Sequence, residues 1–101
     1  MTEAKVKELI LRDDWEVCKA IVLVYQKQTR DERESRSTRN WNGVGFNRYD
    51  AAFLTSLAEQ IIRNKRQGRL YLLSRKQVAA GRKSILKYAG QIARIINEEY
   101  A

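Results

Sequence analysis

Four basic side chains near the end of the sequence have the spacing of a phosphate-binding surface. A helix is predicted from Ser74, which forms a Ser-x-x-Gln capping box with Gln77, to about residue 98. At about 100° per residue, one face of this helix is entirely basic and the opposite face is apolar. The basic face consists of Lys76, Lys83, Lys87 and Arg94. These residues extend over about 25 Å with no carboxylate among them, which suits the backbone of a nucleic acid.

The positive charge of the chain is concentrated in its second half. The 101 residues include 20 Lys and Arg and 12 Asp and Glu, a formal net charge of +8. Residues 51–97 contain ten basic residues and one acidic residue, Glu59, whereas residues 1–50 are nearly balanced. Exposed helices usually mix the two signs so that side chains pair at i,i+4, and an acid-free face therefore indicates a polyanionic partner. The alternative, a solvated helix face without a partner, stays open.

A second candidate surface surrounds the glycine-containing segment 40–46. Three aromatic and two basic residues occur there: Trp41, Phe46, Tyr49, Arg39 and Arg48. An aromatic ring beside cations can stack on a nucleic-acid base, a contact worth about 1–3 kcal/mol. We predict this role for Trp41, with Arg39 and Arg48 beside it. The other interpretation is that Phe46 and Tyr49 pack against the core where the loop enters its helix.

The residue types disfavour an enzyme. The sequence has no histidine and one cysteine, so the commonest general base and the usual transition-metal ligands are missing. The adjacent Asp13 and Asp14 are better explained as a helix cap than as part of a two-metal carboxylate site with Asp50. Cys18 lies in an apolar stretch, which favours packing over nucleophilic chemistry. We expect no catalytic residue, no metal site and no cofactor.

The pattern of apolar residues predicts an all-α fold, a single-domain bundle of about four helices that covers residues 1–101. The first helix is predicted at 2–11, with Thr2 as N-cap, and the last runs from Ser74 to about residue 98. Asp13 or Asp14 is expected to cap a central helix, with Glu16 as the return partner of a capping box. Its apolar residues at 21–24 also fit a buried strand, an alternative that the pattern leaves open.

A third helix is predicted from an N-cap at Asn47 to about Gly68, after the glycine-containing loop. Its core stripe is expected to comprise Phe53, Leu54, Leu57, Ala58, Ile61 and Ile62. A short connector at 69–73 leads to the last helix. No apolar run approaches the 18 residues of a membrane span, and no apolar signal core follows Met1, so we expect a soluble cytoplasmic protein without a membrane partner.

Several short motifs together resemble a known family. The motifs are Gln28-Thr29 with Glu32, Asn42-Gly43-Val44-Gly45-Phe46 with Asp50-Ala51, Ser74-x-Lys76-Gln77, and Arg82-Lys83-x-x-x-Lys87-Tyr88-Ala89-Gly90-Gln91. As a set, across residues 23–93, they are similar to a largely uncharacterised family of short proteins encoded by bacteriophages and other mobile elements. They also resemble segments of phage-type helicase or replication proteins. The resemblance implies a nucleic-acid setting in the cytoplasm of a bacterial host cell.

The sequence departs from the family pattern at a few positions. Gly81 stands where the family usually has alanine, so close helix packing or a local bend is expected there. Arg48 and Tyr49 replace small residues and make the loop bulkier and more basic. Gly90, one turn after Lys87, is expected to leave a bare spot on the basic face where a phosphate could approach. We expect Asp50 to cap backbone amides or pair with Arg48, and the hydroxyl of Tyr88 to reach water or a partner.

Two functions compete at this point. The favoured prediction is a small basic phage-type accessory protein that binds nucleic acid, with DNA as the expected partner, single-stranded DNA included. The alternative is a phage counter-defence inhibitor, of the anti-CRISPR or anti-restriction type, that binds a host protein or a host or phage nucleoprotein complex. The basic charge does not exclude the inhibitor, since a basic protein can bind an acidic protein surface.

Overall fold

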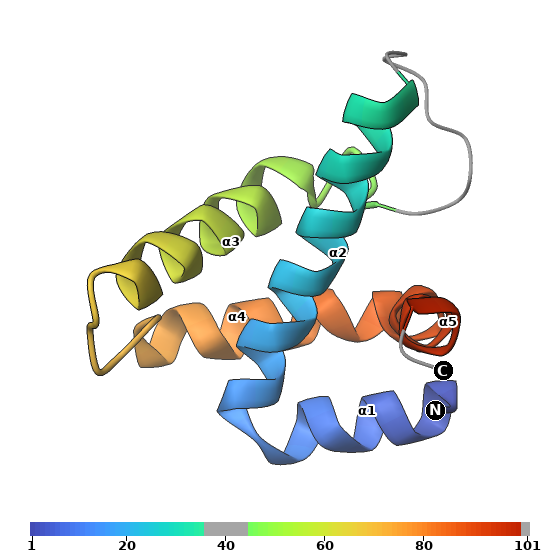
Figure 1. Ribbon diagram of the computed structural model, residues 1–101. Helices are drawn as coiled ribbons and strands as arrows, with labels where there is room; N and C mark the ends of the chain where they lie inside the picture. Colours follow the sequence, from blue (N-terminus) through green and yellow to red (C-terminus); the bar gives the residue numbers. More distant parts are fainter. Residues whose placement is uncertain (36–44, 100–101) are drawn as a thin grey trace.

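The computed structural model describes residues 1–35 and 45–99, and these form a small all-α bundle (Figure 1). The elements are α1 (Glu3–Arg12), α2 (Asp14–Ser35), α3 (Ala51–Arg66), α4 (Arg75–Ile85), a 3-10 turn η1 (Leu86–Tyr88) and α5 (Ala89–Glu99). The described residues contain no strand, so residues 21–24 belong to a helix. The predicted all-α class is confirmed. None of the helices in these ranges has the length and hydropathy to cross a membrane.

The first two helices are joined by a single residue, Asp13. Thr2 caps α1 as predicted, since its hydroxyl accepts a hydrogen bond from the Lys5 amide at 3.1 Å. Asp13 caps α2 by accepting from the Trp15 amide at 2.9 Å. The capping box with Glu16 is wrong, because the Asp13 amide already donates to the Leu9 carbonyl at 3.1 Å and closes α1. The Glu16 carboxylate pairs with Lys19 instead.

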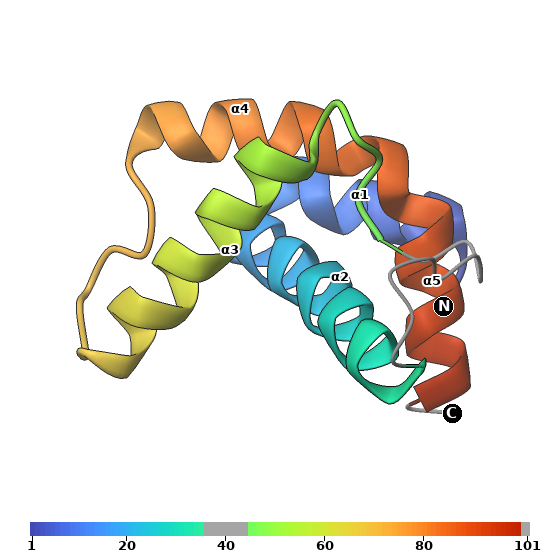
Figure 2. The same cartoon turned by 90° about the horizontal axis from the view of Figure 1, so that it is seen from above.

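The core is built around α2, which contacts all four other helices. Figure 2 shows α2 running between α3 on one side and α5 on the other, with α4 and α1 behind it. Val17, Ile21 and Val24 of α2 are fully buried, as are Leu54 of α3 and Ile85 of α4. The predicted central position of this helix is confirmed, because its side chains are apolar over most of its circumference.

The start and the core stripe of α3 differ from the prediction. The helix begins at Ala51, one turn later than expected, because the Asn47 side chain accepts from the amides of Tyr49 and Asp50 and caps a separate turn. Leu54 and Leu57 are buried with Ala58 and Ile61. Phe53 is 39% exposed, so its predicted core position is wrong. It lies about 80° from the centre of the buried stripe.

The last predicted helix is broken, and this is the main correction to the expected fold. Helix α4 ends at Ile85, Leu86–Tyr88 form a 3-10 turn, and α5 turns away from the axis of α4 (Figures 1 and 2). The expected bend at Gly81 does not occur, because Gly81 lies inside the straight part of α4. Its predicted close packing is confirmed: a Cβ there would lie 3.2 Å from the Cδ1 atoms of Ile21 and Leu57.

The packing at Gly81 gives a stability prediction. The substitution Gly81→Val should lower the free energy of unfolding by about 1–3 kcal/mol, because the new methyl groups must displace side chains of a filled core. Ala79→Val, on the exposed side of the same helix, controls for the lower helix propensity of valine. Urea unfolding followed by circular dichroism measures both variants. Equal losses in the two variants would contradict close packing at Gly81.

Candidate nucleic-acid interface

Six exposed cations gather where α3 ends and α4 begins. They are Arg63, Lys65, Arg66, Arg69, Arg75 and Lys76. Residues 60–81 contain no acidic residue, and Glu59, one turn before Arg63, forms no ion pair with any of the six in the described part of the chain. We call residues 60–81 the cationic hairpin. In Figure 1, the connection between α3 and α4 lies at the end of the molecule opposite α5, and we call residues 69–71 of this connection the tip.

Helix electrostatics account for only half of these cations. Arg63, Lys65 and Arg66 occupy the last turn of α3, where cations are stabilised by the helix dipole. Arg75 and Lys76 open α4, where the dipole disfavours positive charge and where the first turn contains no acidic residue. A pair of cations at this end of a helix costs stability without a local gain. This placement favours a role in binding an anion.

Helix α3 ends in a Schellman motif that fixes the direction of the connection. Gly68 has a φ of +69°, in the left-handed region that glycine tolerates. The Gly68 amide donates to the Lys65 carbonyl at 3.1 Å, and the Arg69 amide donates to the Asn64 carbonyl at 2.9 Å. These are the two hydrogen bonds of the motif. The chain therefore leaves α3 in one defined conformation.

The return of the connection into α4 is fixed as well. The buried Asn64 donates from its side-chain amide to the Leu72 carbonyl at 2.9 Å, and the next side chain, Leu73, is buried. Ser74 and Gln77 form the predicted capping box. Gln77 also exchanges two hydrogen bonds of 2.9 Å with Gln60, which joins α4 to α3. The hairpin is held at both ends of its tip.

The tip itself is highly exposed. Leu70 is 85% exposed and Tyr71 is 79% exposed, although both are large apolar side chains. Sequence reasoning treated 69–73 as a connector and missed this feature. The signal in the sequence was the acid-free run of residues 60–81 around an apolar connector without helical period. The tip therefore combines a backbone fixed at both ends with two exposed large side chains.

Only part of the predicted basic face of Lys76, Lys83, Lys87 and Arg94 is present in the structure. Lys76 and Lys83 lie exposed on α4, as expected. The break at 86–88 separates them from Arg94, which is exposed on α5. Lys87 pairs with Asp50, with its Nζ 2.7 Å from Oδ2. One straight face of four cations is therefore wrong, because it required a continuous helix and an unpaired Lys87.

Gly90 does not provide the bare site on a basic face that the sequence suggested. A Cβ at this position would lie 3.6 Å from the Glu3 carboxyl carbon and 3.7 Å from one of its oxygens. The turn at η1 directs the start of α5 towards α1, so the Glu3 carboxylate, which pairs with Lys7, lies beside Gly90. The position is therefore next to an ion pair and not on a bare basic face.

The second predicted surface is described only in part. Arg39 and Trp41 lie outside the described residues. Arg48 is exposed, with its guanidinium carbon 5.6 Å from the centre of the Tyr49 ring. Tyr49 is 85% exposed, so the alternative interpretation that it packs against the core is wrong. Phe46 does pack inward, in an edge-to-face contact with Tyr88 at 5.6 Å between ring centres.

The residues of the family-like motifs meet in a network that holds the loop before α3. The Tyr88 hydroxyl donates to Asp50 Oδ2 at 2.8 Å and accepts from the Asn47 amide at 2.9 Å. The expectation that this hydroxyl reaches water or a partner is therefore wrong, because it is used inside the protein. Asp50 pairs with Lys87, where the sequence suggested Arg48.

Two glutamines complete this network. Gly45 has a φ of +129°, and its amide donates to the Gln91 side chain at 2.9 Å. The Phe46 amide donates to the Gln28 side chain at 2.8 Å. A Cβ at Gly45 would lie 2.7 Å from that same Gln28 oxygen, so glycine is needed there. The motifs thus connect α2, the loop, α3 and α5, and their role in these contacts is structural.

The ionisation of Asp50 and Tyr88 follows from these contacts. The hydrogen bond from Lys87, and next the one from Tyr88, hold the pKa of the Asp50 carboxyl below its ordinary value of 3.8. Burial raises the pKa of Tyr88 to about 12, and its bond to Asp50 acts in the same direction. At neutral pH the pair is therefore a carboxylate and a neutral phenol. Neither group has a pKa suited to proton transfer near pH 7.

Cys18 is buried and has a perturbed thiol. Burial, and then the charge of Asp14, raise the pKa of the Cys18 thiol, which makes it a weak nucleophile at neutral pH. The buried position of Cys18 confirms its predicted packing role. Across residues 1–35 and 45–99, no three or more His, Cys, Asp or Glu residues are grouped so that they could hold a metal ion.

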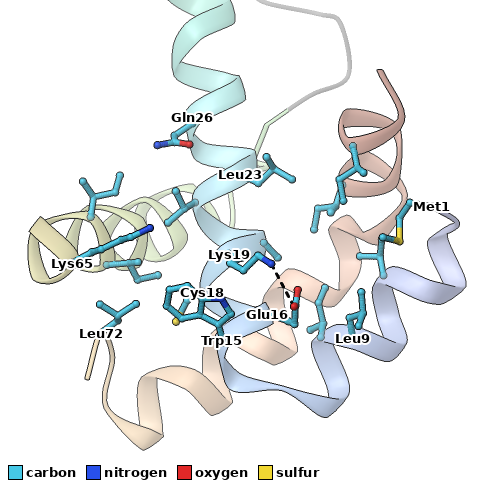
Figure 3. A pocket seen from close by; sticks show the side chains of 18 of the residues that line it. Met1, Leu9, Trp15, Glu16, Cys18, Lys19, Leu23, Gln26, Lys65 and Leu72 are labelled. Atoms are coloured by element: carbon cyan, nitrogen blue, oxygen red, sulfur yellow. Dashed lines mark hydrogen bonds and ion pairs between the residues drawn. The ribbon is translucent and has the colours of Figure 1, made fainter. Parts of the chain in front are cut away.

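An apolar pocket of about 860 Å³ lies along the exposed side of α2. Figure 3 shows Trp15, Lys65 and Leu72 on one side of α2 and Leu9 and Met1 on the other. Trp15 is about half exposed, and the Lys65 ammonium lies 5.8 Å from the centre of its ring. The pocket is separate from the Asp50 network and was not predicted from the sequence.

Comparison with protein-family models, with curated protein sequences and with solved structures gives no match.

The Asp50 network gives a pH-dependent stability prediction. Because the pKa of Asp50 is lowered on folding, its carboxylate stabilises the protein above about pH 4, and this stabilisation is lost as the pH falls through the lowered value. Asp50→Asn should lower the free energy of unfolding by about 1.5–3 kcal/mol at pH 7. The loss should shrink at pH 2.5.

Urea unfolding of the wild type and Asp50→Asn at the two pH values measures this difference. The control is Glu8→Gln, an exposed carboxylate of α1 in i,i+3 and i,i+4 ion pairs, which should change stability by less than about 1 kcal/mol. An Asp50→Asn loss of the same size at both pH values would contradict a charge-dependent role for Asp50.

Proposed function

We propose that the protein binds nucleic acid, with the cationic hairpin and the adjacent Lys83 contacting phosphates. The observation that carries this proposal is the set of exposed cations at residues 60–81, without any acidic residue in that range. Unpaired cations of this kind bind phosphates by releasing condensed counterions, and a neighbouring carboxylate would weaken that effect. Arg75 and Lys76 at the start of α4 add support, because no helix-stabilising effect explains them.

The proposed surface revises the stripe that the sequence suggested. Lys76 and Lys83 keep their role, and the arginines of the hairpin take the place of Lys87, which is paired with Asp50. Arg94 remains a candidate contact on a separate helix. The loop residues Arg39, Trp41 and Arg48 remain candidates for a second contact on the same strand.

The biological setting is also a proposal. The resemblance of the NGVGF and KYAGQ motifs to short phage and mobile-element proteins supports an accessory protein that acts in the cytoplasm of a bacterial host cell. DNA is the expected nucleic acid, since the same motifs resemble segments of phage-type replication proteins. We propose no enzymatic activity and no membrane partner; the exposed cations of the hairpin support a phosphate-binding role instead.

Charge reversal on α4 tests the proposed function. The double variant Lys76→Glu/Lys83→Glu should bind a DNA oligonucleotide more weakly, since it loses two phosphate contacts. The slope of log affinity against log salt should become shallower by about 1.8 for duplex and about 1.4 for a single strand. Fluorescence anisotropy of labelled oligonucleotides at several salt concentrations gives both quantities.

The matched control is Lys5→Glu/Lys7→Glu on α1, which changes the net charge by the same amount. Lys5 and Lys7 are ion-paired with Glu8 and Glu3, respectively, and lie outside the proposed surface. The control should retain most of the salt slope. Equal slopes for the two double variants would show that only the total charge matters and would refute the proposed surface.

A second candidate function is the counter-defence inhibitor, and the apolar pocket along α2 favours it. An amphipathic helix of a protein partner could bury apolar side chains there, and acidic residues on it would face Lys65 and Arg66 at the margin. For a nuclease-treated complex with a known host protein, Trp15→Ser should reduce complex formation and Lys83→Glu should not. The reverse result would support nucleic acid as the partner.

A further inference from the structure

We propose that Tyr71, at the tip of the cationic hairpin, stacks on an unpaired base, so that this surface prefers single-stranded nucleic acid to duplex. The inference rests on the proposed function, and it adds the strand preference and the residue that sets it. Tyr71 belongs to none of the motifs that the sequence singled out. Its candidacy comes from the combination of exposure, fixed backbone and surrounding charge in the structure.

Tyr71 is exposed although the backbone on both sides of it is held by hydrogen bonds. On one side, the Schellman motif at Gly68 sets the backbone direction, and on the other, Asn64 holds the Leu72 carbonyl at 2.9 Å. Three residues lie between these fixed points: Arg69, Leu70 and Tyr71. Leu73 is buried in the core, whereas Leu70 and Tyr71 are exposed to solvent. A preformed tip loses little conformational entropy when it binds, which favours a contact surface.

The charges around the tip match a strand that passes over it. Arg63, Lys65 and Arg66 precede the tip on α3, and Arg75 and Lys76 follow it on α4. A backbone crossing from one helix to the other would therefore meet cations on both sides of the Tyr71 ring. Arg69 is held beside the tip by its Nε, which donates to the Gln67 side chain at 3.1 Å. Cations that follow the backbone and an aromatic ring that meets a base are the two parts of a single-strand site.

Stacking explains why a single strand should be preferred. In a duplex the faces of the bases are covered by their neighbours, so a tyrosine ring can reach them only after local unstacking. In a single strand the faces are accessible, and any base can stack because every base has a flat π-face. The proposed lysine and arginine contacts to phosphates can form with a single strand and with a duplex. The preference for single strands should therefore depend on Tyr71 and not on the cations.

A protein partner is the less favoured occupant of the tip. Leu70 and Tyr71 are only two apolar side chains, and the exposed side chains around them are positively charged. Stable protein interfaces bury about 800 Å² on each partner around a core depleted of charge. Two exposed side chains offer far less apolar area than such a core needs, and the apolar pocket that includes Leu72 is the candidate site for a protein partner.

The test compares Tyr71→Ala and Tyr71→Phe with the wild type by anisotropy on four probes at one salt concentration. The probes are a 20-nucleotide oligo-dT, a 20-nucleotide oligo-U, a 20-base-pair DNA duplex and the free label. Tyr71→Ala should weaken binding to the single strands by about 5- to 150-fold and should change duplex binding by less than twofold. Tyr71→Phe keeps the ring and should bind within about twofold of the wild type. The oligo-dT and oligo-U arms distinguish DNA from RNA as the source of the base.

The matched control is Leu70→Ala, because Leu70 is as exposed as Tyr71, lies next to it in the same tip and has no aromatic ring. It should leave single-strand binding unchanged. The inference is overturned if Tyr71→Ala binds single strands as the wild type does, which would assign the tip to a protein contact, or if it weakens single-strand and duplex binding equally. A loss in Leu70→Ala without a loss in Tyr71→Ala overturns it as well, because the tip would then act through apolar contact and not through stacking.

The outcome also separates this inference from the proposed function. Wild-type protein that binds none of the oligonucleotides at low salt refutes both. Wild-type protein that binds with a steep salt dependence, together with an unaffected Tyr71→Ala variant, refutes only the stacking role. Circular dichroism melting of each variant checks that the fold is retained, which we expect because Tyr71 is exposed and forms no hydrogen bond in the described residues.

Discussion

The hydrogen bond from the Tyr88 hydroxyl to Asp50 connects two parts of the chain that are 38 residues apart, at the junction of three helices. It fixes the residue that precedes α3 to the corner between α4 and α5. The same hydroxyl accepts from the Asn47 amide, and Asp50 also binds Lys87. Because Tyr88 is buried, removing either partner would leave a buried polar group without its hydrogen bond. This corner orients α4 and α5 separately.

The separation of α4 from α5 decides which cations remain on the surface. Lys87 is neutralised at the corner, Arg82 pairs with Asp14 and donates to the Ile10 carbonyl, and Arg30 pairs with Glu99. These basic residues connect different helices, and their charges are already paired with carboxylates of the protein. The cations of the hairpin form no ion pair in the described residues, although Lys65 lies over the Trp15 ring and Arg69 is hydrogen-bonded to Gln67. The described cations thus include an ion-paired group and a group without ion pairs, and six members of the second group belong to the hairpin.

The family-like motifs and the proposed binding surface occupy different places. Gln28, Gly45, Asp50, Tyr88 and Gln91 meet around the loop before α3, where glycine and buried polar groups are needed for geometry. The hairpin tip carries none of these motif residues. A pattern of specific residue types therefore marks a structural network here, while the exposed tip is defined by composition and fixed backbone. A binding surface of this kind needs positive charge and an aromatic ring, and it tolerates many sequences.

The sequence alone determined the helical class, the caps at Thr2 and Ser74, the buried stripe of α2 and the excess of positive charge in the second half. These features depend on local hydrogen bonds and on the period of the helix, which neighbouring residues specify. Only the tertiary structure decided the break at 86–88, the pairing of Lys87 and the exposure of Tyr71. Each of these depends on side chains that meet across distant segments. The local sequence pattern from Ser74 to residue 98 fits a straight helix and a bent helix equally well. The contact between Tyr88 and Asp50, which are far apart in the sequence, is therefore not predicted by that pattern.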